Sequence, residues 1–278
     1  MDNTWMLFTT LLPQWLRDSL EQIPEAAPEL RQLRLRLGQV PLGDFPDGRR
    51  ELSQRKAVPE DLDCVLGRAS GYGAYSSLGL HQGYITASGG HRVGVCGTAV
   101  VKDGQVTGMR SITSLCIRVA RDYPGCGEGL VEKLCGSALL LGAPGSGKTT
   151  LLRDLSRQLG KSESVTVVDE RGELFPQGMD AQGVDVLAGC PKAKGLDMLL
   201  RTMCPQTIAL DEITRPEDCR SLLDAAGCGV RLLATAHGRT RQDLQRRPVY
   251  RQLLEAELFD QLVLVRRPGV YELEGMVQ

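Results

Sequence analysis

Apolar and polar positions follow two different rhythms along the chain. Between residues 137 and 238, short apolar runs alternate with stretches of helical spacing. The apolar runs are 137–141, 165–168, 207–210 and 230–234, and the helical stretches are 150–159, 190–203 and 216–226. Strands that alternate with helices predict a parallel sheet that is covered on both faces. Two later strands, 262–265 and 270–273, are separated by an Arg-Pro-Gly turn.

Before residue 125 the pattern is typical of an antiparallel sheet. The segments 34–37, 84–87, 92–96 and 114–121 alternate or are rich in glycine and β-branched residues, and 59–69 has helical spacing. Asp103-Gly104 is a hairpin signal. We therefore expect a smaller N-terminal α+β domain over residues 1–124, followed by a linker that begins at Pro124 and a second domain over 125–278.

Composition and charge limit the classes of function. The chain has 278 residues, 42% of them hydrophobic and 24% charged, and its net charge is −1. Residues 1–135 carry 15 basic and 15 acidic side chains, which leaves 18 and 19 for the remainder. A global basic field for nucleic acid is therefore absent.

The cysteine pattern, together with the nucleotide-binding motif described below, predicts a reducing cytosol. The 9 cysteines are odd in number and show no C-x-x-C spacing, so neither a disulfide framework nor a zinc site is indicated. The apolar stretch 5–8 is too short to span a bilayer. It predicts a helix that docks on the core, with docking to a membrane or a partner as the alternative.

One motif carries most of the chemistry. The nucleotide-binding pattern G-x-x-x-x-G-K-[ST] is matched by Gly142, Ala143, Pro144, Gly145, Ser146, Gly147, Lys148 and Thr149. It lies between a predicted strand and a helix that opens with Thr150, which we add to the binding residues. Glycines let the backbone wrap a phosphate, the helix start offers N–H groups, and Lys148 can reach the terminal phosphates. The C-terminal domain is thus expected to be a RecA-like P-loop ATPase core of α/β class.

Acidic side chains follow the predicted strand 207–210. Asp211 is positioned to hold Mg²⁺ together with the Thr149 hydroxyl, and Glu212 to polarise the attacking water. A second acidic tip, Asp169 to Glu173, makes Glu170 the alternative catalytic base. A third strand end, after the predicted strand 230–234, carries His237. This histidine could sense the terminal phosphate or position water, or be structural.

This arrangement resembles the ring-forming ATPases of type II and type IV secretion and of pilus retraction. The phosphate loop, the acidic tip 169–173, the pair Asp211-Glu212 and the Thr-x-His box 235–237 carry that resemblance. Segments 35–41, 89–97, 117–121, 168–174 and 183–187 extend it over nearly the whole chain to the family of stage III sporulation proteins AA of endospore-forming bacteria.

The resemblance implies a cytoplasmic ATPase of the mother cell, peripheral to the membrane through protein partners. It implies a homo-oligomeric ring, taken as a hexamer, that works with membrane proteins of the channel complex between mother cell and forespore. In such rings one subunit supplies arginines to its neighbour's nucleotide, and Arg92 and Arg118 are the leading candidates, followed by Arg110 and Arg121. For each arginine, a solvated strand face or a local ion pair is the alternative.

Three functions are compared: an ATP-hydrolysing motor, a nucleic-acid translocase, and a nucleotide-dependent switch without hydrolysis. A late basic cluster favours intersubunit or nucleotide contacts over nucleic acid, because Asp243 interrupts it and no aromatic side chain precedes Tyr250. Its members are Arg239, Arg241, Arg246, Arg247 and Arg251. The presence of Glu212 argues against a pure switch. The cofactors expected are ATP and Mg²⁺, because the Asn-Lys-x-Asp motif of guanine recognition does not occur.

Overall fold

The chain folds as two compact units. A computed structural model describes residues 3–71 and 83–275. The N-terminal unit contains residues 1–122 together with 176–179, and the C-terminal unit contains 123–175 and 180–278. The sequence predicts two domains with a boundary between residues 124 and 125. That division into domains stays a prediction.

The N-terminal unit is built on a six-stranded sheet of order β3-β2-β1-β6-β5-β4 in which every neighbouring pair is antiparallel. Its strands are β1 Gln32–Arg36, β2 Leu42–Phe45, β3 Gly48–Glu51, β4 Tyr84–Thr86, β5 Arg92–Lys102 and β6 Gln105–Arg118. Its helices are α1 Asn3–Leu11, α2 Gln14–Glu21, α3 Ala26–Glu29 and α4 Pro59–Ala69. A short 3₁₀ turn, η3 Ser88–Gly90, precedes β5.

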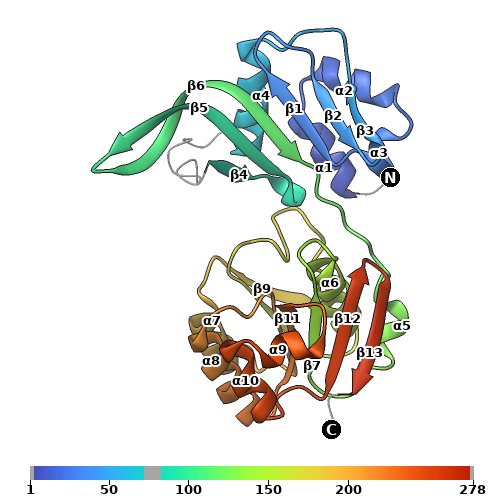
Figure 1. Cartoon of the computed structure of the whole chain (residues 1–278), viewed down its shortest axis with the longest axis vertical. Helices are drawn as coiled ribbons and strands as arrows, with labels where there is room; N and C mark the ends of the chain where they lie inside the picture. The colour runs from blue at the N-terminus through green and yellow to red at the C-terminus, as the bar shows by residue number, and fades with distance from the viewer. Residues whose placement is uncertain (1–2, 72–82, 276–278) are drawn as a thin grey trace. The chain divides into compact units, whose positions relative to one another are not determined.

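Alternation along the strands gives this sheet one apolar face and one polar face. Leu33 and Leu35 of β1 are fully buried and share a core with Phe8 of α1, whereas Arg34 between them is only partly buried. Figure 1 shows the helices of this unit gathered against the sheet. Because Phe8 is buried while Met6 is exposed, α1 uses its apolar side to dock on the core.

Strands β5 and β6 continue beyond the sheet as a two-stranded arm. Past Cys96 and Ser114 the two strands pair with each other as far as Lys102 and Gln105. Residues 96–107 are exposed throughout, and the arm turns at Asp103-Gly104 as the sequence predicts. Figure 1 shows the arm extending away from the remaining strands of its sheet.

The C-terminal unit contains a seven-stranded sheet of order β13-β12-β7-β11-β10-β8-β9. Its strands are β7 Ala138–Gly142, β8 Val165–Asp169, β9 Val184–Ala188, β10 Thr207–Leu210, β11 Arg231–His237, β12 Gln261–Arg267 and β13 Val270–Gly275. All neighbours are parallel except β12 and β13, which form an antiparallel hairpin.

Helices cover both faces of this sheet, and each face has its own core. The helices are α5 Glu128–Val131, α6 Lys148–Leu159, α7 Lys192–Thr202, α8 Pro216–Gly227, α9 Arg241–Gln245 and α10 Pro248–Glu255. Side chains alternate along β7: Leu139 and Leu141 join the core under α7, α8 and α10, whereas Leu140 joins the core under α5 and α6. None of the helices in the described part of the chain has both the length and the apolar character that crossing a membrane requires.

Candidate nucleotide-binding site

The predicted site residues meet at one edge of the C-terminal sheet. Strands β7, β11, β10 and β8 are consecutive neighbours and run parallel, so their carboxyl ends lie together. The phosphate loop follows β7, Asp211 follows β10, the acidic tip follows β8, and β11 ends at His237. Open α/β sheets bind ligands at this edge.

The phosphate loop has the backbone that wraps an anion. Gly145 and Gly147 have φ angles of 75° and 93°, which favour glycine. A Cβ on Gly147 would lie 2.7 Å from Pro268 in the β12–β13 turn, whereas one on Gly145 would meet nothing within 4 Å. Gly147 is therefore required by both conformation and space, and the loop is open at Gly145, where a phosphate could approach. Helix α6 starts at Lys148, so its free N–H groups point into the loop.

Lys148 lies inside the loop rather than in solvent. Its side chain is largely buried, and Nζ donates to the carbonyl oxygens of Gly142 at 2.9 Å and Ala143 at 3.0 Å. Burial lowers the pKa of the Lys148 ammonium, and the carboxylates of Asp211 and Glu212 oppose that effect. A phosphate that enters the loop would replace these neutral carbonyl acceptors with a charged one. Its hydrogen bonds with the Lys148 ammonium would therefore be stronger.

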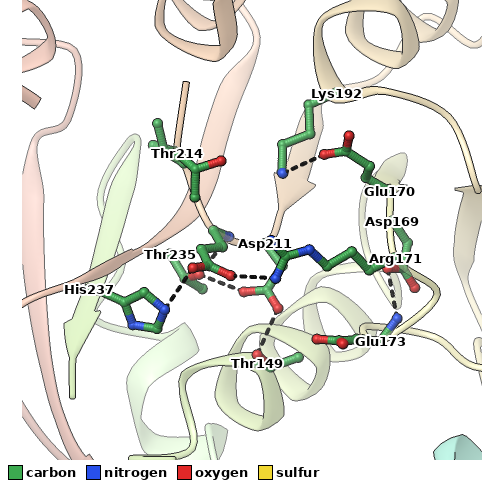
Figure 2. A network of polar contacts seen from close by, with 12 residues as sticks. Thr149, Asp169, Glu170, Arg171, Glu173, Lys192, Asp211, Thr214, Thr235 and His237 are labelled. Atoms are coloured by element: carbon green, nitrogen blue, oxygen red, sulfur yellow. Dashed lines mark hydrogen bonds and ion pairs between the residues drawn. The ribbon is translucent and has the colours of Figure 1, made fainter. Parts of the chain in front are cut away.

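Hydroxyl groups from α6 and β11 hold the carboxylate of Asp211. Thr149 Oγ1 donates to Asp211 Oδ2 at 2.7 Å, and Thr235 Oγ1 donates to Asp211 Oδ1 at 2.5 Å. Thr235 Oγ1 also accepts the backbone N–H of Glu212 at 2.8 Å. One fully buried threonine therefore fixes both acids at the end of β10. Figure 2 shows this network with Thr149, Asp211 and Thr235 close together.

The Thr149 hydroxyl and the Asp211 carboxylate fit Mg²⁺ because they are adjacent hard oxygen ligands. In residues 3–71 and 83–275, this site included, no group of three or more His, Cys, Asp and Glu side chains could hold a metal ion. Mg²⁺ is commonly held by one or two protein oxygens, with phosphates and water completing its shell. The residues present fit that mode of binding.

Glu212 is held between two strand tips. Its backbone φ is 51°, an uncommon value for a residue with a side chain. The Oε1 atom lies 2.7 Å from His237 Nε2, and the Oε2 atom lies 3.0 Å from Arg171 Nη1. The structure thus brings the predicted residues Glu212 and His237 into contact.

The two neighbouring acids at the end of β8, Asp169 and Glu170, make different contacts. Asp169 is buried and accepts three backbone N–H groups, from Glu173, Leu174 and Phe175, at 2.8–2.9 Å. It therefore stabilises the loop that follows β8. Glu170 instead faces the pocket and accepts a hydrogen bond from Lys192 Nζ at 2.8 Å, which lowers the pKa of Glu170.

The candidate arginines belong to the other unit. Arg92 lies on β5 and Arg118 on β6 of the N-terminal sheet, and Arg110 lies on the β5–β6 arm. Arg121 donates to the carbonyl oxygens of Ala27 and Leu30, which gives it a structural role within its own unit.

Sequence reasoning did not single out three cations of the C-terminal unit that line pockets, Arg171, Lys192 and Arg266. Arg171 and Lys192 line a pocket with Asp169, Glu170, Glu173, Asp211 and Glu212. Arg239 and Arg266 line a second pocket with Gly142, Ala143 and Ser146. Arg239 belongs to the late basic cluster for which the sequence favours intersubunit or nucleotide contacts. Arg171 adjoins the predicted acid Glu170, but Lys192 had no local signal beyond its place at a helix start.

Comparisons with known proteins agree with this geometry. The family model for sporulation stage III, protein AA matches residues 7–276. The stage III sporulation protein AA of Bacillus subtilis (strain 168) is 37% identical over 292 residues, which cover 96% of this chain and 95% of the relative.

Two solved structures resemble this chain in fold. The ATPase DotB of Legionella pneumophila superposes with a TM-score of 0.60 at 17% identity, over 91% of this chain and 75% of DotB. The pilus retraction motor PilT, solved with bound ADP, gives 0.58 at 18% identity, over 88% of this chain and 76% of PilT. At these identities the likeness concerns the fold alone. The expected fold class, a P-loop ATPase core of α/β type, is confirmed.

Proposed function

The chain belongs to the family of sporulation stage III, protein AA, and from that premise we propose that it is an ATP-hydrolysing ring motor. The resemblance expected from the sequence is confirmed at the level of the family. The motor energises or gates a secretion-like membrane complex that links mother cell and forespore. It acts in the mother-cell cytoplasm and reaches the membrane through protein partners.

The observation that carries the proposal is the contact between the phosphate loop and the neighbouring strand tips. Thr149 of the loop is bonded to Asp211, Asp211 is bonded to Thr235, and Glu212 is bonded to His237. A chance glycine-rich turn would not place a hydroxyl, two carboxylates and an imidazole in one connected set. These are the groups that phosphoryl transfer to water uses.

Each residue then has a role in the proposed reaction. The loop Gly142 to Thr149, with Thr150, binds the phosphates of ATP, and Lys148 neutralises the terminal ones. Thr149 and Asp211 hold Mg²⁺, which when bound neutralises charge on the phosphates. Glu212 accepts a proton from the attacking water, and His237 orients the Glu212 carboxylate. Glu170 is the alternative base.

A ring gives the two arginines of the N-terminal sheet a function. Arg92 and Arg118 would stabilise the charge that develops on a neighbour's nucleotide, as arginine fingers do. A homo-oligomer, proposed as a hexamer, is required for this contact in trans. The membrane proteins of the sporulation complex are the proposed partners.

Two other functions have weaker support. A nucleic-acid translocase needs a basic face, and the balanced net charge of −1 does not provide one. A switch without hydrolysis has no use for a carboxylate placed beside His237 at the end of β10.

Light scattering during size-exclusion chromatography, with and without ATP and Mg²⁺, tests the proposal together with phosphate release at several protein concentrations. We expect a ring in the presence of nucleotide and a specific activity that rises with concentration. A monomer at every concentration that binds ATP and releases no phosphate would support the switch instead.

A further inference from the structure

Lys192 is a cation at a position that disfavours cations. It is the first residue of α7, and only 4% of it is exposed. The N-terminus of a helix carries partial positive charge, and burial removes the ammonium from water, so both effects act against Lys192. The first turn of α7 contains no acidic side chain that would offset them.

The ammonium of Lys192 points to the proposed site rather than to the helix. Its Nζ atom donates to Glu170 Oε2 at 2.8 Å, and both side chains line the pocket that contains Asp211 and Glu212. Figure 2 shows Lys192 and Glu170 pointing toward each other. The second oxygen of Glu170, Oε1, lies 4.0 Å from Arg215 Nη1, which is beyond hydrogen-bond length.

Stability does not account for this pair. A buried ion pair gains little over apolar side chains of the same volume, because desolvation offsets the attraction. The side chains are 5% and 24% exposed for Lys192 and Glu170, so the lysine bears most of that cost. What the contact does provide is a fixed orientation for the Glu170 carboxylate.

We propose that Lys192 is a positioning residue of the nucleotide site, which holds Oε2 of Glu170 so that Oε1 accepts a hydrogen bond from a water molecule used in hydrolysis. The inference rests on the proposed ATP hydrolysis. Lys192 acts through Glu170 and does not itself touch the reacting atoms. Glu170 then orients water from β8 while Glu212 acts from β10.

Several charged groups share the pocket with Glu170. They are Asp169, Arg171 and Glu173 on its own loop, Asp211 and Glu212 at the end of β10, Lys192 on α7, and Arg215 before α8. The hydrogen bond from Lys192 is the largest effect that lowers the pKa of Glu170. Removing the lysine therefore raises the pKa of Glu170, and the acidic limb of the pH–rate profile moves to higher pH.

The test compares Lys192→Met, which keeps the unbranched stem of the side chain and removes the ammonium, with Lys192→Arg in the full-length protein. Lys194→Met is the matched control, because Lys194 is exposed on the same helix. We expect Lys192→Met to lower kcat about tenfold or more while the affinity for a fluorescent ATP analogue changes little. Lys192→Arg should restore most of the loss, and Lys194→Met should behave as wild type.

A double-mutant cycle separates positioning from a merely structural role. In the Glu170→Ala background, Lys192→Met should lower kcat by less than about twofold, because the carboxylate that Lys192 positions is already removed. Equal losses in both backgrounds, or a Lys192→Met protein that matches Lys194→Met, would overturn the inference alone. Wild-type turnover is measured first, since its absence would refute the proposed hydrolysis itself.

Discussion

Arg92 of β5 and Arg118 of β6 lie directly opposite each other in the N-terminal sheet. Like charges at directly paired positions destabilise a sheet, and Arg92 lies over the Tyr84 ring, 4.2 Å from its centroid. Arg118 is exposed. Because the two positions are paired, both arginines are candidates for the proposed contact with a neighbouring subunit's nucleotide.

The trans role predicts complementation between different mutants. Arg92→Ala and Arg118→Ala should each lower turnover about 100-fold with little change in ATP affinity, because they remove only transition-state stabilisation. Mixing either with a Lys148→Ala protein should restore activity, since one subunit completes the other's site. Arg49→Ala, at the same row of the sheet on β3, is the control. Mixtures that stay inactive, or full turnover by dilute monomer, would exclude the trans mechanism.

Lys148→Ala should lower ATP turnover at least about 100-fold, because the lysine is the buried cation of the phosphate loop. The fold should persist, since Lys148 contacts carbonyl oxygens of its own loop. Circular dichroism checks the fold and phosphate release checks turnover. Lys161→Ala, at an exposed position after α6, is the control and should leave ATP turnover unchanged. Unchanged turnover in Lys148→Ala would remove the proposed site.

Glu212→Gln should keep ATP affinity and slow hydrolysis about 100-fold, as expected when a general base is lost. The amide can still contact His237, so the change isolates the loss of basicity. If the Glu170→Gln variant hydrolyses ATP slowly and the Glu212→Gln variant does not, Glu170 is the general base. Phosphate release and binding of a fluorescent ATP analogue, measured side by side, decide between them. Loss of binding in either variant points to a structural or Mg²⁺ role.

Thr235→Val should destabilise the fold by about 1–3 kcal/mol, because it leaves a carboxylate oxygen of Asp211 and the N–H of Glu212 without their partner. It should also raise the Mg²⁺ concentration needed for half-maximal turnover, because the Asp211 carboxylate keeps only the hydrogen bond from Thr149. Thr235→Ser, which keeps the hydroxyl, is the control. Urea unfolding gives the first effect, and equal stability of the valine and serine variants would contradict it.

Cys219 should resist alkylation while the protein is folded. Burial raises the pKa of its thiol from an ordinary value of 9.0 to about 11. The exposed Cys204 and Cys228 should react with iodoacetamide at pH 8.5, and Cys219 only after unfolding. Because only the unfolded state ionises this thiol between pH 9 and 11, its contribution to stability is lost as pH rises through that range. Mass spectrometry of the labelled peptides gives the result.

Local patterns were enough to predict the elements with strong periodicity. The helix expected at 59–69 is α4 Pro59–Ala69, which has Pro59 at its start and Asp61 accepting the N–H of Val58 at 3.0 Å. The phosphate loop between β7 and α6 could also be predicted. Its signals are an apolar strand, glycines and a helix with regularly spaced leucines, and they lie within a few residues of one another.

Weakly patterned strands were not predicted. Strand β2 contains Gly43 and Asp44, and β9 Val184–Ala188 is only partly buried at the edge of its sheet. Such strands form because a neighbour pairs with them, as β8 does with β9, so the information lies in the partner and not in the segment.

By itself, the sequence determined the phosphate loop and which acids follow which strands, because these depend on spacing along the chain. The partners of those acids were decided only by the tertiary structure. Lys192 meets Glu170 across 22 residues, and Arg171 meets Glu212 across 41. Both contacts exist because the sheet order places the ends of β8 and β10 side by side and α7 beside β8. Strand order is a property of the packed sheet, and no local pattern of apolar and polar residues encodes it.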